Sequence, residues 1–415
     1  MTIQNKLFNI GFSILFSLIV VSYFNDNITH GKKIASAINF ERGYSTSNEQ
    51  LGKNVPIEGN IEQLKYFFDA LKKSKTQSVH VAHFGDSMVW GDIITADLRD
   101  MLQKTYGGRG IGFLAFSKDD VSVRQTVKQN YSDGWEFASL FTRNDKRYEL
   151  GISGTAAVSA GANSVEYTFT NERVSSSSFT EYSVFTLNKN SDVKFSYELN
   201  SDNKKYLTIP KSNKLSVINE SVNSSNKKIK FSFVGSPDSY LYGVNFESGN
   251  GVYVDNFPIR GNSGVSLQDI SQEIYESFNS NLNYKLIILN FGVNALGVNP
   301  LWYEKQMGKV IEKIKKYFPE TSILIVSAAD RAIKKGSGFQ TDPKIIELID
   351  VQKKIAINNN VAFWNMFEAM GGKNSMVKWV DNNPSLGVKD YVHFTSIGGK
   401  RIAELLMNSL NDLMK

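Results

Sequence analysis

The chain has 415 residues, of which 41% are hydrophobic and 12% aromatic, so it has enough apolar material for two folded domains. Its formal net charge is +6, with basic residues scattered rather than clustered. That pattern excludes a nucleic-acid-binding stripe. It would suit a mild attraction to an anionic polymer or membrane surface, but an ordinary solvated, slightly basic surface is the favoured interpretation. The absence of cysteine excludes disulfides, zinc–thiolate sites and a lipoprotein anchor, and four histidines are too few for a multi-histidine centre. We therefore expect no metal and no cofactor.

An apolar segment near the N-terminus is the one targeting signal. Residues 7–24 are apolar and uncharged, and crossing a bilayer needs about 20 such residues. No small-x-small cleavage site follows directly, so we predict an uncleaved signal anchor over residues 1–27, with cleaved export as the alternative. Either outcome places the rest of the chain outside the cytoplasm, in the periplasm or cell envelope, membrane-anchored or secreted.

The next segments are typical of a linker followed by an α/β domain. Residues 28–58 are polar and rich in Ser, Asn and Gly, as expected of a linker. Between residues 59 and 114, apolar spacing predicts a helix over 61–73, a strand over 78–84 and a helix over 92–106. This stretch is the predicted first part of the α/β domain.

Residues 115–256 have a different pattern. Short alternating runs rich in aromatic and β-branched residues, such as "VEYTFT" and "KIKFSFVG", are separated by Ser, Asn and Gly clusters. They predict an antiparallel all-β domain, a sandwich or jelly roll. Helix–strand alternation resumes over residues 257–415, where "YKLIILNFG" predicts a parallel strand buried on both faces. The fold class is therefore α/β with an inserted all-β domain.

The first predicted strand ends on Gly85-Asp86-Ser87. Ligands of open α/β sheets bind at this carboxyl edge of the strands, so Ser87 is a candidate nucleophile. Gly-Asp-Ser is also ordinary turn chemistry, and a plain turn residue is the alternative. No Gly-x-Ser-x-Gly elbow occurs, which excludes the usual α/β-hydrolase arrangement.

A carboxylate and a histidine lie three residues apart just before the last predicted helix, in "KDYVHFTSIGGK". This spacing can place Asp390 against Nδ1 of His393 and leave Nε2 free to take a proton from a serine. The alternative is a turn-capping Asp390 beside a surface histidine.

Two glycine-containing segments could supply oxyanion donors. "IRGNSGVSL" places Gly264 in a loop, where its N–H can point into a site without an intervening side chain. "LNFGVNAL" ends a buried strand with Gly292 and Asn294, and an asparagine amide at a strand end can donate to an oxyanion. The alternatives are a tight turn at Gly264 and a turn residue at Asn294.

Taken in order, these motifs resemble those of the SGNH (or GDSL) hydrolase family, over roughly residues 59–112 and 257–415. The resemblance implies a three-layer fold around a parallel sheet, and catalysis without metal or cofactor. It also implies site residues. The catalytic residues would be the nucleophile Ser87, the general base His393 and its orienting partner Asp390. The oxyanion hole would comprise the Ser87 N–H, the Gly264 N–H and the Asn294 side chain, supported by Gly85, Asp86 and Gly292.

The third motif departs from the family pattern. Many members have an acidic residue after the asparagine, whereas this chain has Ala295. Asp92 and Asp330 are candidates to occupy the same region, although a structural role is favoured for both. His83, in the strand leading to Ser87, is interpreted as a hydrogen-bonded core histidine.

The inserted β domain and "GGRGIGFLAF" after the first helices resemble the peptidoglycan O-acetylesterase branch of the family, in which the insert is similar to a carbohydrate-binding module. Trp364, Phe367 and Trp379 could stack on sugar rings, with core packing as the alternative. The predicted function is removal of O-acetyl groups from peptidoglycan or another extracellular polysaccharide through an acyl-enzyme.

Two other functions remain open from the sequence. An O-acetyltransferase would use the same triad with a sugar hydroxyl in place of water. A surface carbohydrate-binding protein would use the β domain and carry a vestigial hydrolase fold. Hydrolysis of a small acetyl ester separates the enzymes from the binding protein.

Overall fold

The computed structural model describes residues 51–415 except 120–122, 142–143, 145–146, 160, 171, 201 and 236–238, and apart from the side chains of 223–226. The predicted membrane segment, residues 7–24, and most of the predicted linker lie outside the described residues. Within the described part, the helices are too short or too polar to cross a bilayer.

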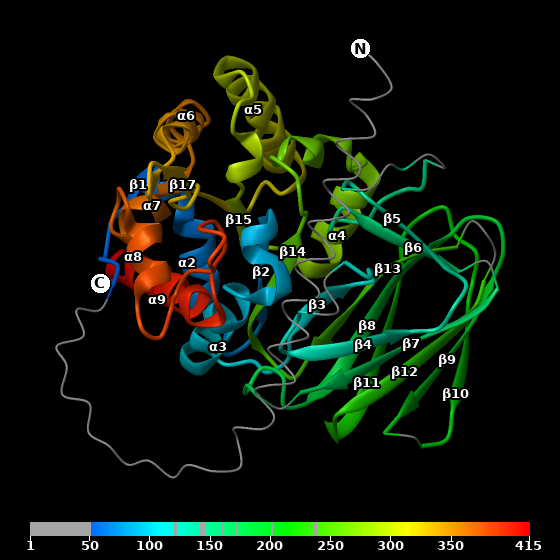
Figure 1. Ribbon diagram of the computed structural model, residues 1–415. Coiled ribbons are helices and arrows are strands. Elements are labelled where there is room, and N and C mark those ends of the chain that lie inside the picture. The colour runs from blue at the N-terminus through cyan, green and yellow to red at the C-terminus, as the bar shows by residue number, and fades with distance from the viewer. Residues whose placement is uncertain are drawn as a thin grey trace, which may run out of the picture. The chain divides into compact units, whose positions relative to one another are not determined.

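A six-stranded sheet forms the centre of the α/β part (Figure 1). Its order is β1–β19–β16–β15–β2–β14, and all neighbours are parallel except β1, which pairs antiparallel with β19 at one edge. Every residue of β15 and β16 is buried, because both faces of the sheet are covered by helices. The strands are β1 (Ile57–Gly59), β2 (Ser78–Gly85), β14 (Gly251–Pro258), β15 (Leu286–Asn290), β16 (Ser322–Val326) and β19 (Ala362–Trp364).

Helices cover the two faces in separate groups, which makes three layers. In β15, Ile287 and Leu289 face a core shared with α4, α5 and α6. Leu286 and Ile288 face a core shared with α2, α3, α7, α8 and α9. This alternation confirms the predicted α/β fold with a parallel sheet. The helices are α2 (Lys65–Leu71), α3 (Thr95–Tyr106), α4 (Gln272–Leu282), α5 (Pro300–Tyr317), α6 (Pro343–Asn358), α7 (Met366–Met370), α8 (Ser375–Asp381) and α9 (Ser396–Asp412), with 3-10 helices η1 (Ile61–Leu64), η2 (Ser87–Asp92), η3 (Val265–Asp269) and η4 (Val293–Ala295).

The insert contains two antiparallel sheets, of order β10–β9–β12–β7–β4 and β11–β8–β13–β6–β5, with β3 added beside β13. Residues of both sheets share one apolar core, as in a sandwich. The second sheet also packs on the α/β part, where Phe185 stacks on Phe278 of α4 with ring centroids 5.0 Å apart. The strands are β3 (Gly112–Ala115), β4 (Val127–Tyr131), β5 (Trp135–Ser139), β6 (Thr155–Ser159), β7 (Ala162–Phe169), β8 (Phe179–Asn188), β9 (Val193–Leu199), β10 (Lys205–Ile209), β11 (Ser216–Asn226), β12 (Lys228–Val234) and β13 (Ser239–Glu247); a small hairpin, β17 (Ala332–Lys335) and β18 (Gly338–Thr341), lies in the α/β part.

Two strands at the borders of the insert differ from the prediction. The sequence pattern predicts residues 251–256 as part of the insert, but β14 pairs with β2 in the parallel sheet along its whole length. β3, assigned to the α/β part up to residue 114, pairs with β13. β14 lacks the continuous apolar run of a buried parallel strand because it carries Asp255 and Asn256. Both are buried, bonded to Tyr284 Oη (2.6 Å) and Thr95 Oγ1 (2.7 Å) respectively.

Candidate active site

Three motif-bearing strands end at the same edge of the sheet. Gly85, the last residue of β2, is in register with Pro258 at the end of β14 and with Asn290 at the end of β15. The loops that follow these strands carry Ser87, Gly264 and Asn294. The sheet therefore brings the serine, glycine and asparagine motifs to one edge, as expected of parallel strands.

The loop carrying the serine is fixed by Asp86. One carboxylate oxygen accepts the Met88 N–H and the other accepts the Gly292 N–H, each at 2.9 Å. Asp86 is fully buried, and this burial raises its pKa despite the two N–H groups and the nearby His393. Asp86 thus joins the serine loop to the asparagine loop.

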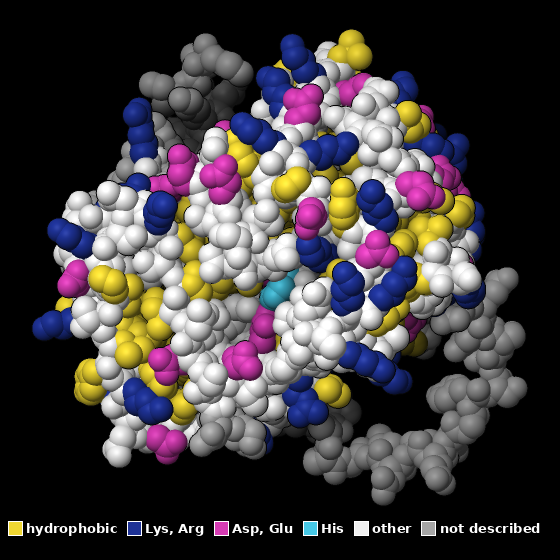
Figure 2. All heavy atoms as spheres, turned by 180° about the vertical axis from the view of Figure 1, so that it is seen from behind, with side chains coloured by type: hydrophobic (Ala, Val, Ile, Leu, Met, Phe, Trp, Pro, Cys, Tyr) yellow, Lys and Arg dark blue, Asp and Glu magenta, His cyan; other side chains and the backbone are white. Residues whose placement is uncertain are grey.

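Ser87, His393 and Asp390 form a hydrogen-bonded chain. Ser87 Oγ lies 2.9 Å from His393 Nε2, and His393 Nδ1 lies 2.7 Å from Asp390 Oδ2. The His393 side chain is 39% exposed, and Figure 2 shows a histidine at the surface near the middle of one face, beside acidic side chains. This order of atoms is that of a serine–histidine–aspartate triad.

The loop before α9 holds Asp390 in place. Its Oδ1 accepts the N–H groups of Val392 (2.9 Å) and His393 (3.0 Å). Partial burial would raise the pKa of Asp390, but its bonds with His393 and Val392 outweigh this effect and lower the pKa. Asp390 therefore stays ionised and can orient the imidazole through Nδ1–H.

Asn294 lies in η4, directly after the strand that ends at Asn290. Its Nδ2 is buried and has no hydrogen-bond partner among the described residues. The amide faces the Asp86 carboxylate closely enough to lower the pKa of that group, so Asp86 helps to orient Asn294. A buried donor without a partner is costly, which is expected of a group arranged for a ligand.

Gly264 adopts a left-handed backbone conformation with φ 91°, and a Cβ there would lie 2.7 Å from the Phe291 ring. Its N–H donates to Asn262 Oδ1 at 2.8 Å, so this predicted oxyanion donor is occupied by a side chain of its own loop. The sequence offered no signal for this bond other than Asn262 itself, two residues upstream.

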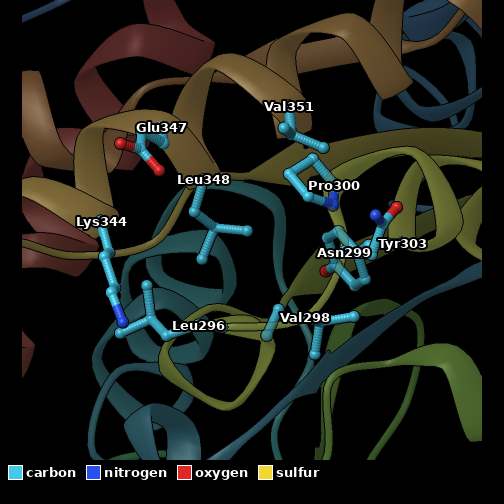
Figure 3. Close-up of a pocket in the computed structure, with 11 residues that line it drawn as sticks. Leu296, Val298, Asn299, Pro300, Tyr303, Lys344, Glu347, Leu348 and Val351 are labelled. Carbon is cyan, nitrogen blue, oxygen red and sulfur yellow. The ribbon is translucent and has the colours of Figure 1, made fainter.

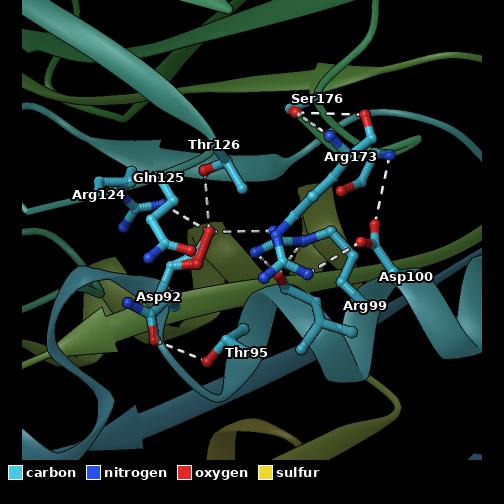
Figure 4. Close-up of polar contacts among 12 residues, drawn as sticks. Asp92, Thr95, Arg99, Asp100, Arg124, Gln125, Thr126, Arg173 and Ser176 are labelled. Carbon is cyan, nitrogen blue, oxygen red and sulfur yellow. Dashed lines mark hydrogen bonds and ion pairs between the residues drawn. The ribbon is translucent and has the colours of Figure 1, made fainter. Parts of the chain in front are cut away.

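The two acidic residues considered in place of Ala295 make structural contacts. Asp92 Oδ2 accepts bonds from Arg99 (3.1 Å), Arg124 (3.5 Å) and Thr126 (3.0 Å), which joins α3 to the insert (Figure 4). Asp330 accepts the Met376 N–H at 2.8 Å and the Thr341 hydroxyl at 2.8 Å. Neither carboxylate has an oxyanion group or triad member among these partners.

Four residues considered for the site are core residues. Trp364, Phe367 and Trp379 are all buried, so they pack in the core and are not sugar platforms. His83 is buried and its Nδ1 lies 3.0 Å from Thr95 Oγ1. Burial lowers the pKa of His83 to about 4, as expected of a neutral core histidine.

Other aromatic and basic side chains lie at this edge and were missed from the sequence. Trp90, in η2, donates from Nε1 to the Asp119 carbonyl at 2.7 Å, and the Arg260 guanidinium lies 4.0 Å from the centre of its ring. Gln125 of the insert donates to Ser396 at the start of α9 at 2.6 Å. A loop of the insert therefore contacts both the serine loop and the helix that follows His393.

A cavity of about 340 Å³ adjoins the asparagine loop, between the start of α5 and α6 (Figure 3). It is lined by Ala295, which follows Asn294, and by Tyr303, whose hydroxyl donates to the Ser263 carbonyl at 3.1 Å. The cavity thus borders the loop that carries Asn294, and its volume is within the range of small-molecule sites. Among the described residues, no group of three or more His, Asp or Glu side chains is placed to hold a metal ion.

Comparison with solved structures identifies a shared fold. The chain is similar to a structure described as a peptidoglycan O-acetylesterase in action, with 21% identity over 85% of this chain and 95% of that chain and a TM-score of 0.68. The chain is less similar to a structure of the acetyl xylan esterase AlAXEase, with 21% identity over 38% of this chain and 80% of that chain and a TM-score of 0.30. It is also less similar to a family two carbohydrate esterase from Clostridium thermocellum in complex with cellohexaose, with 11% identity over 68% of this chain and 99% of that chain and a TM-score of 0.27.

No protein-family model and no curated protein sequence matches the chain. The resemblance to SGNH hydrolases is confirmed at the level of the fold by the first structure, which is matched over 85% of this chain. The chain therefore shares the fold of that structure, and it carries a serine–histidine–aspartate arrangement at the carboxyl edge of the parallel sheet.

Proposed function

We propose that this chain is a serine esterase that removes O-acetyl groups from an extracellular polysaccharide, with peptidoglycan as the polymer. The observation that carries the proposal is the triad from Ser87 Oγ through His393 to Asp390, with contacts of 2.9 and 2.7 Å. The unpartnered Asn294 amide supports it, because acyl transfer needs a donor for the developing oxyanion.

In the first half-reaction, Ser87 Oγ attacks the acetyl carbonyl carbon while His393 Nε2 takes its proton. Asp390 stabilises the imidazolium through Nδ1–H, since its lowered pKa keeps the carboxylate charged. The tetrahedral oxyanion accepts hydrogen bonds from Asn294 Nδ2 and from backbone N–H groups. The bond to the sugar oxygen then breaks, and His393 gives that oxygen its proton.

In the second half-reaction, His393 Nε2 takes a proton from water, and the resulting hydroxide attacks the acetyl-Ser87 carbonyl. Collapse of this intermediate releases acetate and returns the proton to Ser87 Oγ. The Gly264 N–H joins the oxyanion hole when its present acceptor, Asn262 Oδ1, turns aside.

The choice of polymer is supported by the fold shared with a peptidoglycan O-acetylesterase structure. The insert favours a polymeric substrate, because its loop contacts the serine loop through Trp90 and α9 through Ser396. We further propose that residues 7–24 anchor the chain to the membrane and place the enzyme outside the cytoplasm, as their apolar sequence predicts. Mass spectrometry of the mature N-terminus tests anchor against cleavage.

The first test is hydrolysis of a small chromogenic acetyl ester by the full chain. Ser87→Ala and His393→Ala should each lower kcat/KM by about 10³-fold or more, because each removes a member of one catalytic unit. Ser280→Ala, an exposed serine on α4, is the matched control and should keep full activity. Equal rates for wild type and both triad variants would refute the proposal.

The second test is acetate release from O-acetylated peptidoglycan. Wild type should release acetate, and Ser87→Ala should not. Repeating the assay with an acceptor oligosaccharide shows whether water or a sugar hydroxyl receives the acetyl group. Glycan binding without ester turnover by wild type would instead indicate a carbohydrate-binding protein.

A further inference from the structure

Arg260 begins the loop that leads from β14 to Gly264. The preceding residue, Ile259, donates its N–H to the Gly85 carbonyl at 2.8 Å. Gly85 is two residues before Ser87, so Arg260 leaves the sheet directly beside the serine loop. The guanidinium is therefore positioned at the same sheet edge as the triad.

The Arg260 guanidinium is held over an aromatic ring. Its central carbon lies 4.0 Å from the centre of the Trp90 ring, within cation–π range. Trp90 is itself fixed by its bond to the Asp119 carbonyl at 2.7 Å. A planar cation stacked in this way keeps its in-plane N–H donors available to a ligand.

Arg260 has no carboxylate partner in the described part of the chain, and no described residue accepts a hydrogen bond from its guanidinium. The other buried or half-buried arginines there each pair with an Asp or Glu: Arg99, Arg124, Arg173, Arg331 and Arg401. Arg260 is also half-buried. A partly desolvated, unpaired guanidinium next to a nucleophile is suited to an anionic ligand.

An aromatic side chain of the insert packs against the loop that follows Arg260. Phe141 is 53% exposed, and its ring contacts Gly261 so closely that a Cβ there would lie 2.6 Å from Cε2. Gly261 has φ 69°, a conformation that favours glycine. The exposed ring can pack against the apolar face of a sugar one residue away from the cation.

We propose that Arg260 and Phe141 form a subsite for a carboxylate-bearing sugar, so that the substrate is an acidic O-acetylated glycan. The carboxylate accepts two N–H bonds from the guanidinium, and the ring face packs on Phe141. This inference rests on the proposed esterase activity, and it specifies a sugar with a free carboxylate. Such a sugar distinguishes the substrate from peptidoglycan in which the muramic acid carboxyl is linked to peptide. The formal net charge of +6 agrees with an acidic polymer.

The test compares two substrates that differ in one charge, an O-acetylated hexuronic acid and its methyl ester. Wild type should hydrolyse the acid with a kcat/KM about 10- to 100-fold higher, mainly through KM, because a charged hydrogen-bonded pair is lost with the methyl ester. In Arg260→Gln the ratio should fall to within about threefold, and Arg260→Lys should retain part of it.

Three variants separate recognition from structure. If Arg260 only supported the loop, Arg260→Gln would slow both substrates alike and leave their ratio unchanged. Phe141→Ala should raise KM for both sugars while keeping the ratio. Arg109→Gln removes the same charge from an exposed arginine near the start of β14, at the other end of the sheet, and should keep the wild-type ratio.

Failure of this inference is distinguishable from failure of the esterase function. Equal rates for the two substrates in wild type, or an unchanged preference in Arg260→Gln, would overturn the subsite while the esterase function stands. If wild type hydrolyses no ester, the function fails. The subsite is then judged by calorimetry with the unacetylated hexuronic acid, whose binding must exceed that of its methyl ester and weaken in Arg260→Gln.

Discussion

Asp86 and Asp92 lie at the two ends of the segment that carries Ser87, and both carboxylates are buried. They are stabilised in different ways. Asp86 is bonded to two backbone N–H groups and its pKa is raised, because burial outweighs those bonds. Asp92 lies beside Arg99 and Arg124, and their charges outweigh burial and lower its pKa. Asp86 connects catalytic loops of the α/β part, whereas Asp92 connects the α/β part to the insert.

The different partners of Asp86 and Asp92 indicate different roles, one in positioning the catalytic loops and the other in stabilising the fold. Asp86 uses neutral donors from Met88 and Gly292, which fix the positions of two loops without introducing another charge. Asp92 is the charged centre of a buried network that includes Arg99, which also bonds the Val254 carbonyl with two nitrogens. Loss of Asp86 should therefore affect catalysis most, and loss of Asp92 should affect folding most.

The largest expected effect is that of Asp92→Asn on stability. The substitution keeps the shape, and Asn tolerates the left-handed backbone at φ 65°. It removes the charge that compensates the fully buried Arg99, so the free energy of unfolding should fall by about 3–5 kcal/mol. Urea denaturation measures this change.

The control for Asp92→Asn is Asp100→Asn. Asp100 follows Arg99 on α3 and pairs with the half-buried Arg173 of the insert, which keeps its two bonds to Asp97. Its loss should cost about 1 kcal/mol or less. Equal losses for the two variants would show that the Asp92 network contributes no more than the partly exposed pair of Asp100 and Arg173.

The next effect is that of Asp86→Asn on catalysis. One carboxylate oxygen becomes an NH₂ group, so either the Met88 or the Gly292 N–H loses its acceptor. The loops carrying Ser87 and Asn294 then shift, and we expect kcat on the chromogenic ester to fall about 10²-fold. Asp92→Asn, measured on its folded fraction, should lose less than about tenfold. The reverse ranking would contradict the distinction between the two carboxylates.

The smallest effect is on the pH dependence of stability. The folded pKa of Asp92 is below its unfolded value of about 3.9, so its contribution is present above that pH and lost as pH falls through the folded pKa. The effect of Asp86 on stability has the opposite dependence on pH, because burial raises its folded pKa. Its protonated form favours the folded state at low pH, and this advantage is lost as pH rises through the folded pKa. Between pH 5 and 3, Asp92→Asn should therefore lose less unfolding free energy than wild type, by at most about 1.4 kcal/mol per pH unit. Urea titrations at several pH values provide the check, and parallel curves would exclude the effect.

The sequence predicted the layers of the fold and the residues that meet at the sheet edge. Ser87 and His393 are far apart in the chain, and their order after predicted strands and before a predicted helix was enough to place them together. Periodicity identifies such elements because one face of each must be buried. Predicting that the triad residues meet required only their positions in loops at the sheet edge and no knowledge of side-chain contacts.

Contacts between distant segments could not be predicted in the same way. Asp255 and Asn256 interrupt the apolar run of β14, and the sequence does not show that both find buried partners elsewhere in the chain. Trp364 and Trp379 resemble sugar platforms because composition does not distinguish a buried ring from an exposed one. The stack of Arg260 on Trp90 depends on two loops that meet only in the folded chain.

The strand order also sets the sequence of events during synthesis. β2 lies between β14 and β15, and both partners follow the insert in the chain. β2 therefore leaves the ribosome with its apolar residues unpaired, and the sheet cannot close until the insert has been made. The Gly107 carbonyl accepts the Val252 N–H at 3.0 Å, so the two ends of the insert-containing segment meet beside α3. Once the insert is folded, the chain between β2 and β14 is effectively shorter, which lowers the entropy cost of bringing β14 to β2.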